Sequence, residues 1–436
     1  MSPAIAIPLM FATLLVCLAL GLPLAFTMGG IAVIFTALLW GTGGLAGLVS
    51  ASLGVMGNFV LVAIPLFILM SMILDKAKIA TDLFNAAYKW SGPLRGSLAA
   101  VTILVCTIVA ATTGIAATGV IAMGLIAFPR MMQYKYKKEI SLGSILAGGS
   151  LGELIPPSTV IILYGATVGV SVGRMFAGGI CAGVIFSGLF IAYVLTRAFF
   201  QKDLCPALPA EDRASWRDKM LSLRTIILPV FVIVVVLGSI ITGAATPTEA
   251  AAVGVAGAII SAAALRRLNW SMIKASCIET IKLSGMVGWI VVSAACFSST
   301  VLALGAARMM GDILMAMPGG ALASMALTLG IVFLLGMFVS PTAIIFICGP
   351  LFAPAMQQLG IDSLWYSILF VSMLQVAYIS PPFGYSLFYL SGVTPADITI
   401  RDVYKSAWPF IVLQVVALII FVVSPEVVLW LPHLMG

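Results

Sequence analysis

The chain has 436 residues, of which 62% are hydrophobic and only 8% are charged. Soluble globular proteins carry about 25% charged residues, so a mean hydropathy of +1.20 excludes that class and indicates a polytopic membrane protein. The net charge of +7 fits the lysine and arginine excess of cytoplasmic loops and does not indicate a nucleic-acid partner.

Cysteine and histidine usage narrows the function further. The seven cysteines show no CxxC spacing, which is typical of small buried hydrophobic residues rather than metal ligands. His433 is the single histidine, and the sequence has no HExxH cluster. We therefore expect no enzyme that depends on a metal or on histidine.

The N-terminal region predicts three membrane spans, at residues 4–20, 23–40 and 56–74. It has no charged residue before Asp75 and lacks the basic region and cleavage site of a signal peptide, so the first span is expected to be retained. Residues 76–95 alternate basic with apolar side chains, which predicts an amphipathic helix in the cytoplasmic interface.

Residues 96–129 carry no charge and lie between two basic residues, Arg95 and Arg130. Two full crossings need about 40 residues, so this segment favours a re-entrant hairpin (about 97–129) that returns to the cytoplasmic face. Its midpoint at 110–119 is small and rich in hydroxyls, as expected of a hairpin tip that approaches a ligand. The alternative is a single span with a small-residue packing face.

Residues 141–170 predict a broken membrane helix. Gly148, Gly149 and Gly152 precede the pair Pro156–Pro157, which removes two backbone donors and disfavours helix before it. Unwound backbone at membrane depth is tolerated only inside protein or beside water. A broken helix of this kind indicates the substrate and ion site of a secondary transporter.

The remaining segments complete the expected order. A span at 176–196 is followed by a cytoplasmic linker at 197–224, which divides the chain into domains 1–196 and 225–436. The second domain predicts spans at 225–241 and 249–265, a basic interfacial arm at 266–282, a span at 283–304, a hairpin at about 321–353, a broken helix at 363–390 and a last span at 407–424.

An internal duplication relates the two domains at an offset of about 225 residues. The matched pairs are Gly124 with Gly349, Pro129 with Pro354, Pro156–Pro157 with Pro381–Pro382, and Tyr164 with Tyr389. The loop 130–139 carries four basic residues, whereas its counterpart 355–362 carries none. Opposite charge bias predicts opposite membrane faces, so we expect two inverted-topology repeats, each with about five spans and one re-entrant hairpin.

Two hairpin tips and two broken helices are expected to meet near the midplane of the membrane. Their hydroxyls and carbonyls would suit a cation such as Na⁺, and the N-termini of the half-helices would face an anion. The predicted cation ligands are Thr112, Thr113, Gly149, Ser150, Gly152, Ser340, Thr342, Ala377 and Ser380. The predicted substrate-binding residues are Thr113, Gly114, Glu153, Pro156, Pro157, Ser158, Ser340, Pro381 and Pro382.

Two acidic residues receive different interpretations. Glu153 is the one acid in a predicted membrane-depth break, where it is expected to bind a cation, titrate or gate, unless it lies in a wet vestibule or pairs with a basic residue. Glu249 follows Thr246-Pro247-Thr248, which predicts a capping box that opens a helix.

Several motifs resemble the large membrane subunit of the tripartite ATP-independent periplasmic (TRAP) transporters. The resembling segments are Gly152-Glu-Leu-Ile-Pro-Pro-Ser158 with Ile161–Gly165, Thr246–Ala251, Ser340–Ile345, Leu359–Asp362 and Ser380–Gly384. Glu153 stands where that family usually has an apolar residue.

The resemblance implies an all-α, elevator-type, Na⁺-coupled importer of an organic acid in a bacterial inner membrane, with no organic cofactor. Its implied partners are membrane lipid, a separate four-span membrane subunit and a periplasmic binding protein that delivers the substrate. The alternative is a stand-alone cation-coupled carboxylate carrier of the same superfamily. A channel would not need two broken helices and two hairpins, and an intramembrane enzyme would need a nucleophile and base that the sequence lacks.

Overall fold

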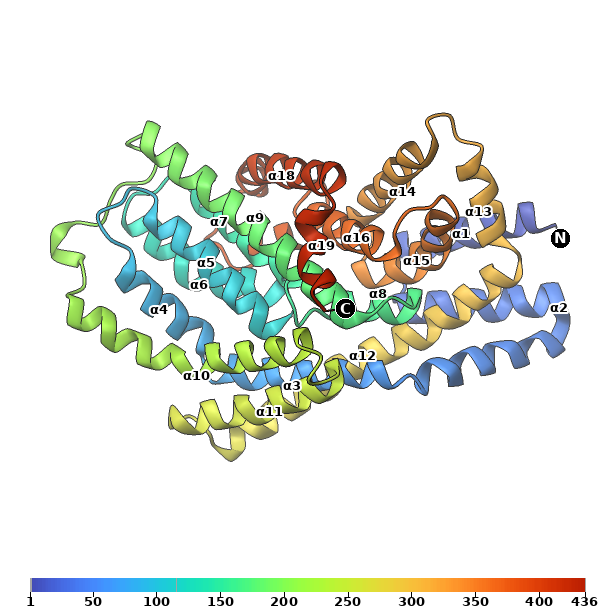
Figure 1. The fold of residues 1–436 in the computed structure, drawn as a ribbon, viewed down its shortest axis with the longest axis horizontal. Coiled ribbons are helices and arrows are strands. Elements are labelled where there is room, and N and C mark those ends of the chain that lie inside the picture. The colour runs from blue at the N-terminus through green and yellow to red at the C-terminus, as the bar shows by residue number, and fades with distance from the viewer. Residues whose placement is uncertain (1, 115, 436) are drawn as a thin grey trace.

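The computed structural model describes residues 2–114 and 116–435, and this part of the chain contains helices and no strand (Figure 1). Ile115, which belongs to the predicted first hairpin tip, lies outside the described residues. The helices of the first half are α1 (Pro3–Ala19), α2 (Leu24–Met56), η1 (Phe59–Val62), α3 (Ala63–Lys76), α4 (Ile79–Trp90), α5 (Ser97–Thr113), α6 (Ala116–Gln133), α7 (Lys138–Ser150), η2 (Leu151–Glu153), α8 (Thr159–Val168) and α9 (Val172–Phe200). Those of the second half are η3 (Ala210–Asp212), α10 (Trp216–Ile241), α11 (Pro247–Ala264), α12 (Trp270–Ala303), α13 (Ala306–Met315), α14 (Gly320–Gly336), α15 (Pro341–Gln358), α16 (Ser363–Tyr378), α17 (Tyr385–Ser391), α18 (Ile400–Val423) and α19 (Glu426–His433).

The predicted hairpins and broken helices correspond to helices that recur along the chain. Both ends of α15 lie 225 residues after those of α6, and α16 begins 225 residues after α7. The peptide bonds Pro156–Pro157 and Pro381–Pro382, at the centres of the two breaks, are both cis. The helix order α5 to α9 therefore repeats as α14 to α18.

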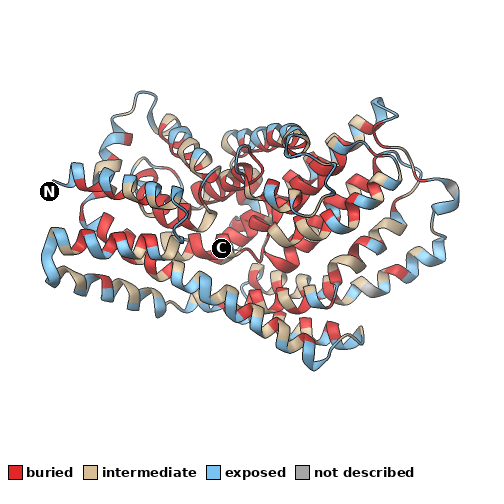
Figure 2. Cartoon of the chain, turned by 180° about the vertical axis from the view of Figure 1, so that it is seen from behind, coloured by how far each residue is buried: buried red, intermediate tan, exposed pale blue. Residues whose placement is uncertain are grey.

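Two groups of helices can be distinguished. The long-helix group comprises α1 to α3 and α10 to α12, in which α2 packs along α12 and α11 packs on α3 (Figure 1). The hairpin group comprises α5 to α9 and α14 to α19, in which α7 packs on α5, α6 and α18. Buried residues concentrate in the middle of the molecule, where the hairpin group lies (Figure 2).

Seven helices are long and apolar enough to cross a membrane, or eight if the bent α10 counts as one span, among the residues that the structure describes. Many large apolar side chains on these helices are exposed, including Phe26 at 77% and Leu38 at 74%. Such surfaces are stable in a lipid environment. The chain is therefore a multi-pass membrane protein.

Three predictions of element boundaries were wrong. Residues 41–55, left outside the predicted spans, form the second part of α2, which kinks at Gly41 (φ +68°) and continues to Met56. The basic segment 266–282 is not a separate arm, because Asn269 caps the start of α12 and the helix then runs without a break to Ala303. The element at the repeat position of α4 is instead α13.

The expected linker is also shorter than predicted. Helix α9 continues to Phe200, and α10 begins at Trp216, where the Ser215 hydroxyl accepts a hydrogen bond from the Asp218 N–H. The predicted capping box at Thr246 and Glu249 is confirmed, with the Thr246 N–H donating to Glu249 Oε2 at 2.8 Å. Its null interpretation as a structural cap therefore holds.

Candidate functional site

The first hairpin tip lies directly on the first broken helix. Helix α5 ends at Thr113, and Gly114 turns the chain with φ +62°. A Cβ on Gly114 would overlap the carbonyl oxygen of Pro157, so only glycine permits this approach. Further along, a Cβ on Gly119 would lie 3.3 Å from the Cα of Gly149. The structure thus brings the predicted tip and the predicted break together.

The second hairpin makes a related approach. A Cβ on Gly336, at the end of α14, would lie 2.5 Å from the Cβ of Ala377 on α16. Ser340 is the N-cap of α15, where its hydroxyl accepts a hydrogen bond from the Ala343 N–H at 3.4 Å. Thr342 follows in the first turn of α15 and makes no hydrogen bond to another predicted site residue in the described structure.

Ser158 ties the two halves of the first broken helix together. Its hydroxyl donates to the carbonyl oxygen of Glu153 at 2.5 Å and accepts from the Ile161 N–H at 3.2 Å. The first bond reaches back to the end of η2, and the second caps the start of α8. In the second break, the carbonyl oxygen of Pro382 accepts a hydrogen bond from the Tyr404 hydroxyl at 2.6 Å.

Equivalent residues of the two repeats touch each other between the broken helices. The side-chain amide of Gln375 lies 2.8 Å from Oγ of Ser150, and these residues are 225 positions apart. Amide oxygen and nitrogen are assigned from their surroundings. The orientation that satisfies both ends donates to the Ser150 carbonyl and accepts from the Leu151 N–H at 3.2 Å. Both side chains are fully buried.

Glu153 faces its own repeat counterpart, Tyr378. The carboxyl group is hydrogen-bonded to the Tyr378 side chain, and the Glu153 residue is only 8% exposed. Its Oε2 atom has no hydrogen-bond partner, and no lysine or arginine pairs with it, in the part of the chain that the structure describes. Tyr385 stacks on Tyr378 with ring centroids 5.7 Å apart. The alternatives of a basic partner or an exposed vestibule are therefore wrong for Glu153.

The hydroxyl groups among the predicted cation ligands donate within their own helices. Those of Thr112 and Thr113 both donate to the carbonyl oxygen of Val109, at 2.7 and 3.0 Å. Those of Ser150 and Ser380 donate to Ala147 and Val376. A hydroxyl that donates keeps its oxygen lone pairs as acceptors. These oxygens can therefore still coordinate a hard cation.

Sequence reasoning missed three residues that contact the site: Ser71, Gln375 and Tyr378. Ser71 lies on α3 and its hydroxyl is within 3.0 Å of the Thr112 carbonyl and 2.8 Å of the Thr113 carbonyl. Gln375 and Tyr378 carried a usable signal, because they are the repeat counterparts of Ser150 and Glu153. Ser71 carried none, since a lone serine in an apolar helix is common.

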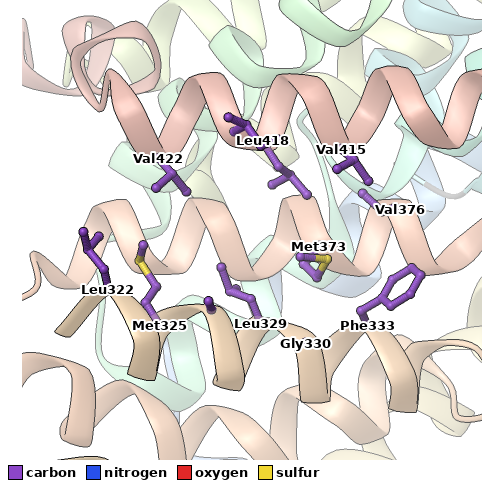
Figure 3. A pocket seen from close by; sticks show the side chains of 12 residues that line it. Leu322, Met325, Leu329, Gly330, Phe333, Met373, Val376, Val415, Leu418 and Val422 are labelled. Atoms are coloured by element: carbon purple, nitrogen blue, oxygen red, sulfur yellow. The ribbon is translucent and has the colours of Figure 1, made fainter. Parts of the chain in front are cut away.

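Two cavities border the hairpin group. One, of about 420 Å³, lies between α14, α16 and α18 and is lined by apolar side chains such as Leu329, Phe333 and Met373 (Figure 3). It offers no polar group to an ion. The other, of about 400 Å³, lies between α2, η1, α8, α12 and α15 and contains the polar side chains of Asn58, Thr167, Ser298 and Ser299.

Comparisons with known proteins agree with this architecture. The family model described as "Tripartite ATP-independent periplasmic transporter, DctM component" matches residues 11–427. The chain is 31% identical to the C4-dicarboxylate TRAP transporter large permease protein DctM of Pseudomonas aeruginosa, over 87% of each chain. It is 29% identical to the ectoine TRAP transporter large permease protein TeaC of Halomonas elongata, over 98% of this chain and 99% of that one.

A solved structure supports the fold. The YdaH transporter of Alcanivorax borkumensis superposes with a TM-score of 0.67 over 94% of this chain and 97% of that one, at 14% identity. The relatives are named as transporter permeases and not as enzymes. This chain is therefore a large permease subunit of the TRAP transporter family.

Proposed function

We propose that this chain is the transmembrane subunit of a Na⁺-coupled secondary importer that takes up an organic acid across a bacterial inner membrane. The observation that carries the proposal is the contact between the two broken helices through equivalent residues, Ser150 and Gln375, beside the first hairpin tip. A discontinuous helix in each of two repeats is the arrangement by which secondary transporters build a midplane site.

The contacts support repeats that are inverted. When two copies are related by a two-fold axis, a residue near that axis meets its own equivalent, as Ser150 meets Gln375 and Glu153 meets Tyr378. The start of α7 also contacts the start of α18, through Lys138 with Asp397 at 3.1 Å. The equivalent pair, α16 with α9, is in contact as well. Paired contacts of this kind are expected if the hairpin group moves as one elevator domain.

The chemistry of the site favours a hard cation beside an anionic cargo. We propose that Na⁺ is held by oxygens of Thr112, Thr113, Gly149, Ser150 and Gly152 in the first repeat and of Ser340, Thr342, Ala377 and Ser380 in the second. The N-terminus of α8, capped by Ser158, presents backbone donors and the positive end of a helix dipole to a carboxylate. Gly114, Glu153, Pro156, Pro157, Pro381 and Pro382 would complete the surroundings of the cargo.

The relatives suggest the cargo class and the partners. Those compared are named for C4-dicarboxylates, ectoine and sialic acid, and all as TRAP transporter permeases. We propose an organic acid of similar size, delivered by a periplasmic binding protein, and a separate small membrane subunit that packs on the exposed apolar faces of this chain.

Purification from the native membrane in mild detergent, with mass spectrometry of co-purifying proteins, tests the partners. We expect a small hydrophobic protein of about four spans in stoichiometric amount. A chain that purifies alone and transports in liposomes without a binding protein would instead support a stand-alone carboxylate carrier.

Sodium coupling is tested by Thr113→Ala and Ser340→Ala. Each removes an oxygen from the proposed cation site, so we expect the half-saturating Na⁺ concentration for uptake to rise about threefold to tenfold, the equivalent of one lost ligand interaction of about 1 kcal/mol. Thr102→Ala and Ser215→Ala are matched controls, because Thr102 bonds within α5 and Ser215 caps α10 in the linker. An unchanged sodium activation curve in both site variants, at normal expression, would contradict the assignment.

The role of the buried carboxyl is tested by Glu153→Gln. This change keeps the shape of the side chain and removes its negative charge, so we expect a change in the sodium dependence of uptake. Glu249→Gln is the control, because that carboxyl is exposed and caps α11. Uptake by Glu153→Gln with wild-type sodium and pH dependence would make Glu153 a bystander.

A further inference from the structure

Two serines of the long-helix group hydrogen-bond to the two hairpins. Ser71 of α3 reaches the carbonyl oxygens of Thr112 and Thr113 at the end of α5. Ser298 of α12 donates to the carbonyl oxygen of Phe346 on α15 at 2.7 Å. At the repeat offset, Ser71 and Ser298 are only two residues from equivalence, so each repeat supplies one such serine to its own hairpin.

Both serines meet carbonyl groups that have no partner within their own helix. Thr112 and Thr113 are the last two residues of α5, and the final carbonyls of a helix lack an intrahelical donor. Phe346 lies four residues before Pro350, which has no N–H to donate to it. Ser71 is fully buried and Phe346 is 5% exposed, so bulk water does not readily satisfy these carbonyls.

The surroundings of Ser298 make its bond specific to one placement of α15. The cavity of about 400 Å³ separates α12 from α8 and α15, and Ser298, Ser299 and Pro350 line it. Ser299 makes no hydrogen bond to the hairpin group in the described structure. The bond from Ser298 to Phe346 is therefore a defined polar contact across a loosely packed boundary.

We propose that Ser71 and Ser298 are positioning residues that hold the two hairpins at their present level against the long-helix group. This inference rests on the proposed elevator function. If the hairpin group slides, both carbonyls lose their serine, so the two bonds favour the present conformation over any displaced one. Removing either serine is expected to lower the population of this conformation relative to the displaced one by about threefold to tenfold.

The test measures the distance between spin labels on the two helix groups in the complete transporter, reconstituted in nanodiscs. Trp289 on α12 and Trp408 on α18 are 69% and 58% exposed and suit labelling after substitution by cysteine. The seven native cysteines are first replaced, in a background that retains uptake. Distances are recorded with and without Na⁺.

We expect Ser71→Ala and Ser298→Ala to reduce the population at the present distance, and Ser299→Ala to leave it unchanged. Pro350→Ala supplies an N–H for Phe346 within α15, so Ser298→Ala should change the population less than twofold when Pro350→Ala is also present. Uptake should show an altered maximal rate in Ser298→Ala with an unchanged half-saturating Na⁺ concentration.

The outcomes separate this inference from the proposed function. Two distances whose ratio is the same in wild type, Ser71→Ala and Ser298→Ala would overturn the positioning role and leave the elevator intact. An effect of Ser298→Ala that persists with Pro350→Ala would overturn the role of the freed carbonyl. A single distance in wild type that Na⁺ does not move would overturn the elevator itself.

Discussion

Gly114→Ala is expected to reduce uptake by at least about tenfold and to destabilise the transporter. Alanine in the left-handed conformation of Gly114 is strained by about 1–2 kcal/mol. In addition, its Cβ would overlap the carbonyl oxygen of Pro157, and relieving such an overlap costs about a further 1–3 kcal/mol. Because the obstacle is backbone, the first hairpin tip must shift away from the broken helix. Uptake into proteoliposomes and the thermal unfolding midpoint measure both effects.

Gly169→Ala is the matched control. Gly169 also has a positive φ, +79°, at the end of α8, but a Cβ there would meet nothing within 4 Å. It shares the backbone strain of Gly114→Ala without the overlap at the site. Equal losses in the two variants would mean that strain alone matters and that the approach of Gly114 to Pro157 does not.

Gln375→Leu is expected to lower the free energy of unfolding by about 1–3 kcal/mol, because it leaves buried polar groups of Ser150 and Leu151 without a partner. If the two broken helices are coupled here, Ser150→Ala and Gln375→Leu should be non-additive, with an interaction energy of about 0.5–3 kcal/mol. Chemical or thermal unfolding of the four members of this double-mutant cycle gives the value.

The control for this cycle is Gln414→Leu. Gln414 on α18 is also fully buried, but its Oε1 has no hydrogen-bond partner in the described residues. Replacing it should be nearly neutral or stabilising. A Gln375→Leu variant as stable as wild type, with additive effects in the cycle, would contradict a structural link between the repeats at this point.

The duplicated diproline made most of the hairpin group predictable from sequence. Once Pro156–Pro157 was aligned with Pro381–Pro382, the hairpins and broken helices followed in both repeats, and the structure places helices there. The contact of Ser150 with Gln375 was not anticipated, because a single sequence shows which residues are equivalent but not which equivalents touch.

The long-helix group was less predictable, since packing overrides local propensity there. Residues 41–55 contain Gly41, Gly43, Gly44, Gly47 and Gly54, which favoured a break. The structure instead keeps this segment helical beside α12, where Ser52 Oγ lies 3.1 Å from Sγ of Cys296. Small residues allow such close helix contacts in membranes. Likewise, the charges of 266–282 suggested an interfacial arm, although they lie on the first turns of a continuous helix.

The most direct test of the central claim is uptake into proteoliposomes that contain this chain and its small subunit, with an imposed Na⁺ gradient. The panel of radiolabelled organic acids should include succinate, sialic acid and ectoine, each with its matching periplasmic binding protein. The account predicts uptake that requires both the binding protein and an inward Na⁺ gradient, and that Gly114→Ala abolishes. Uptake that proceeds equally without Na⁺, or without any binding protein, would contradict it.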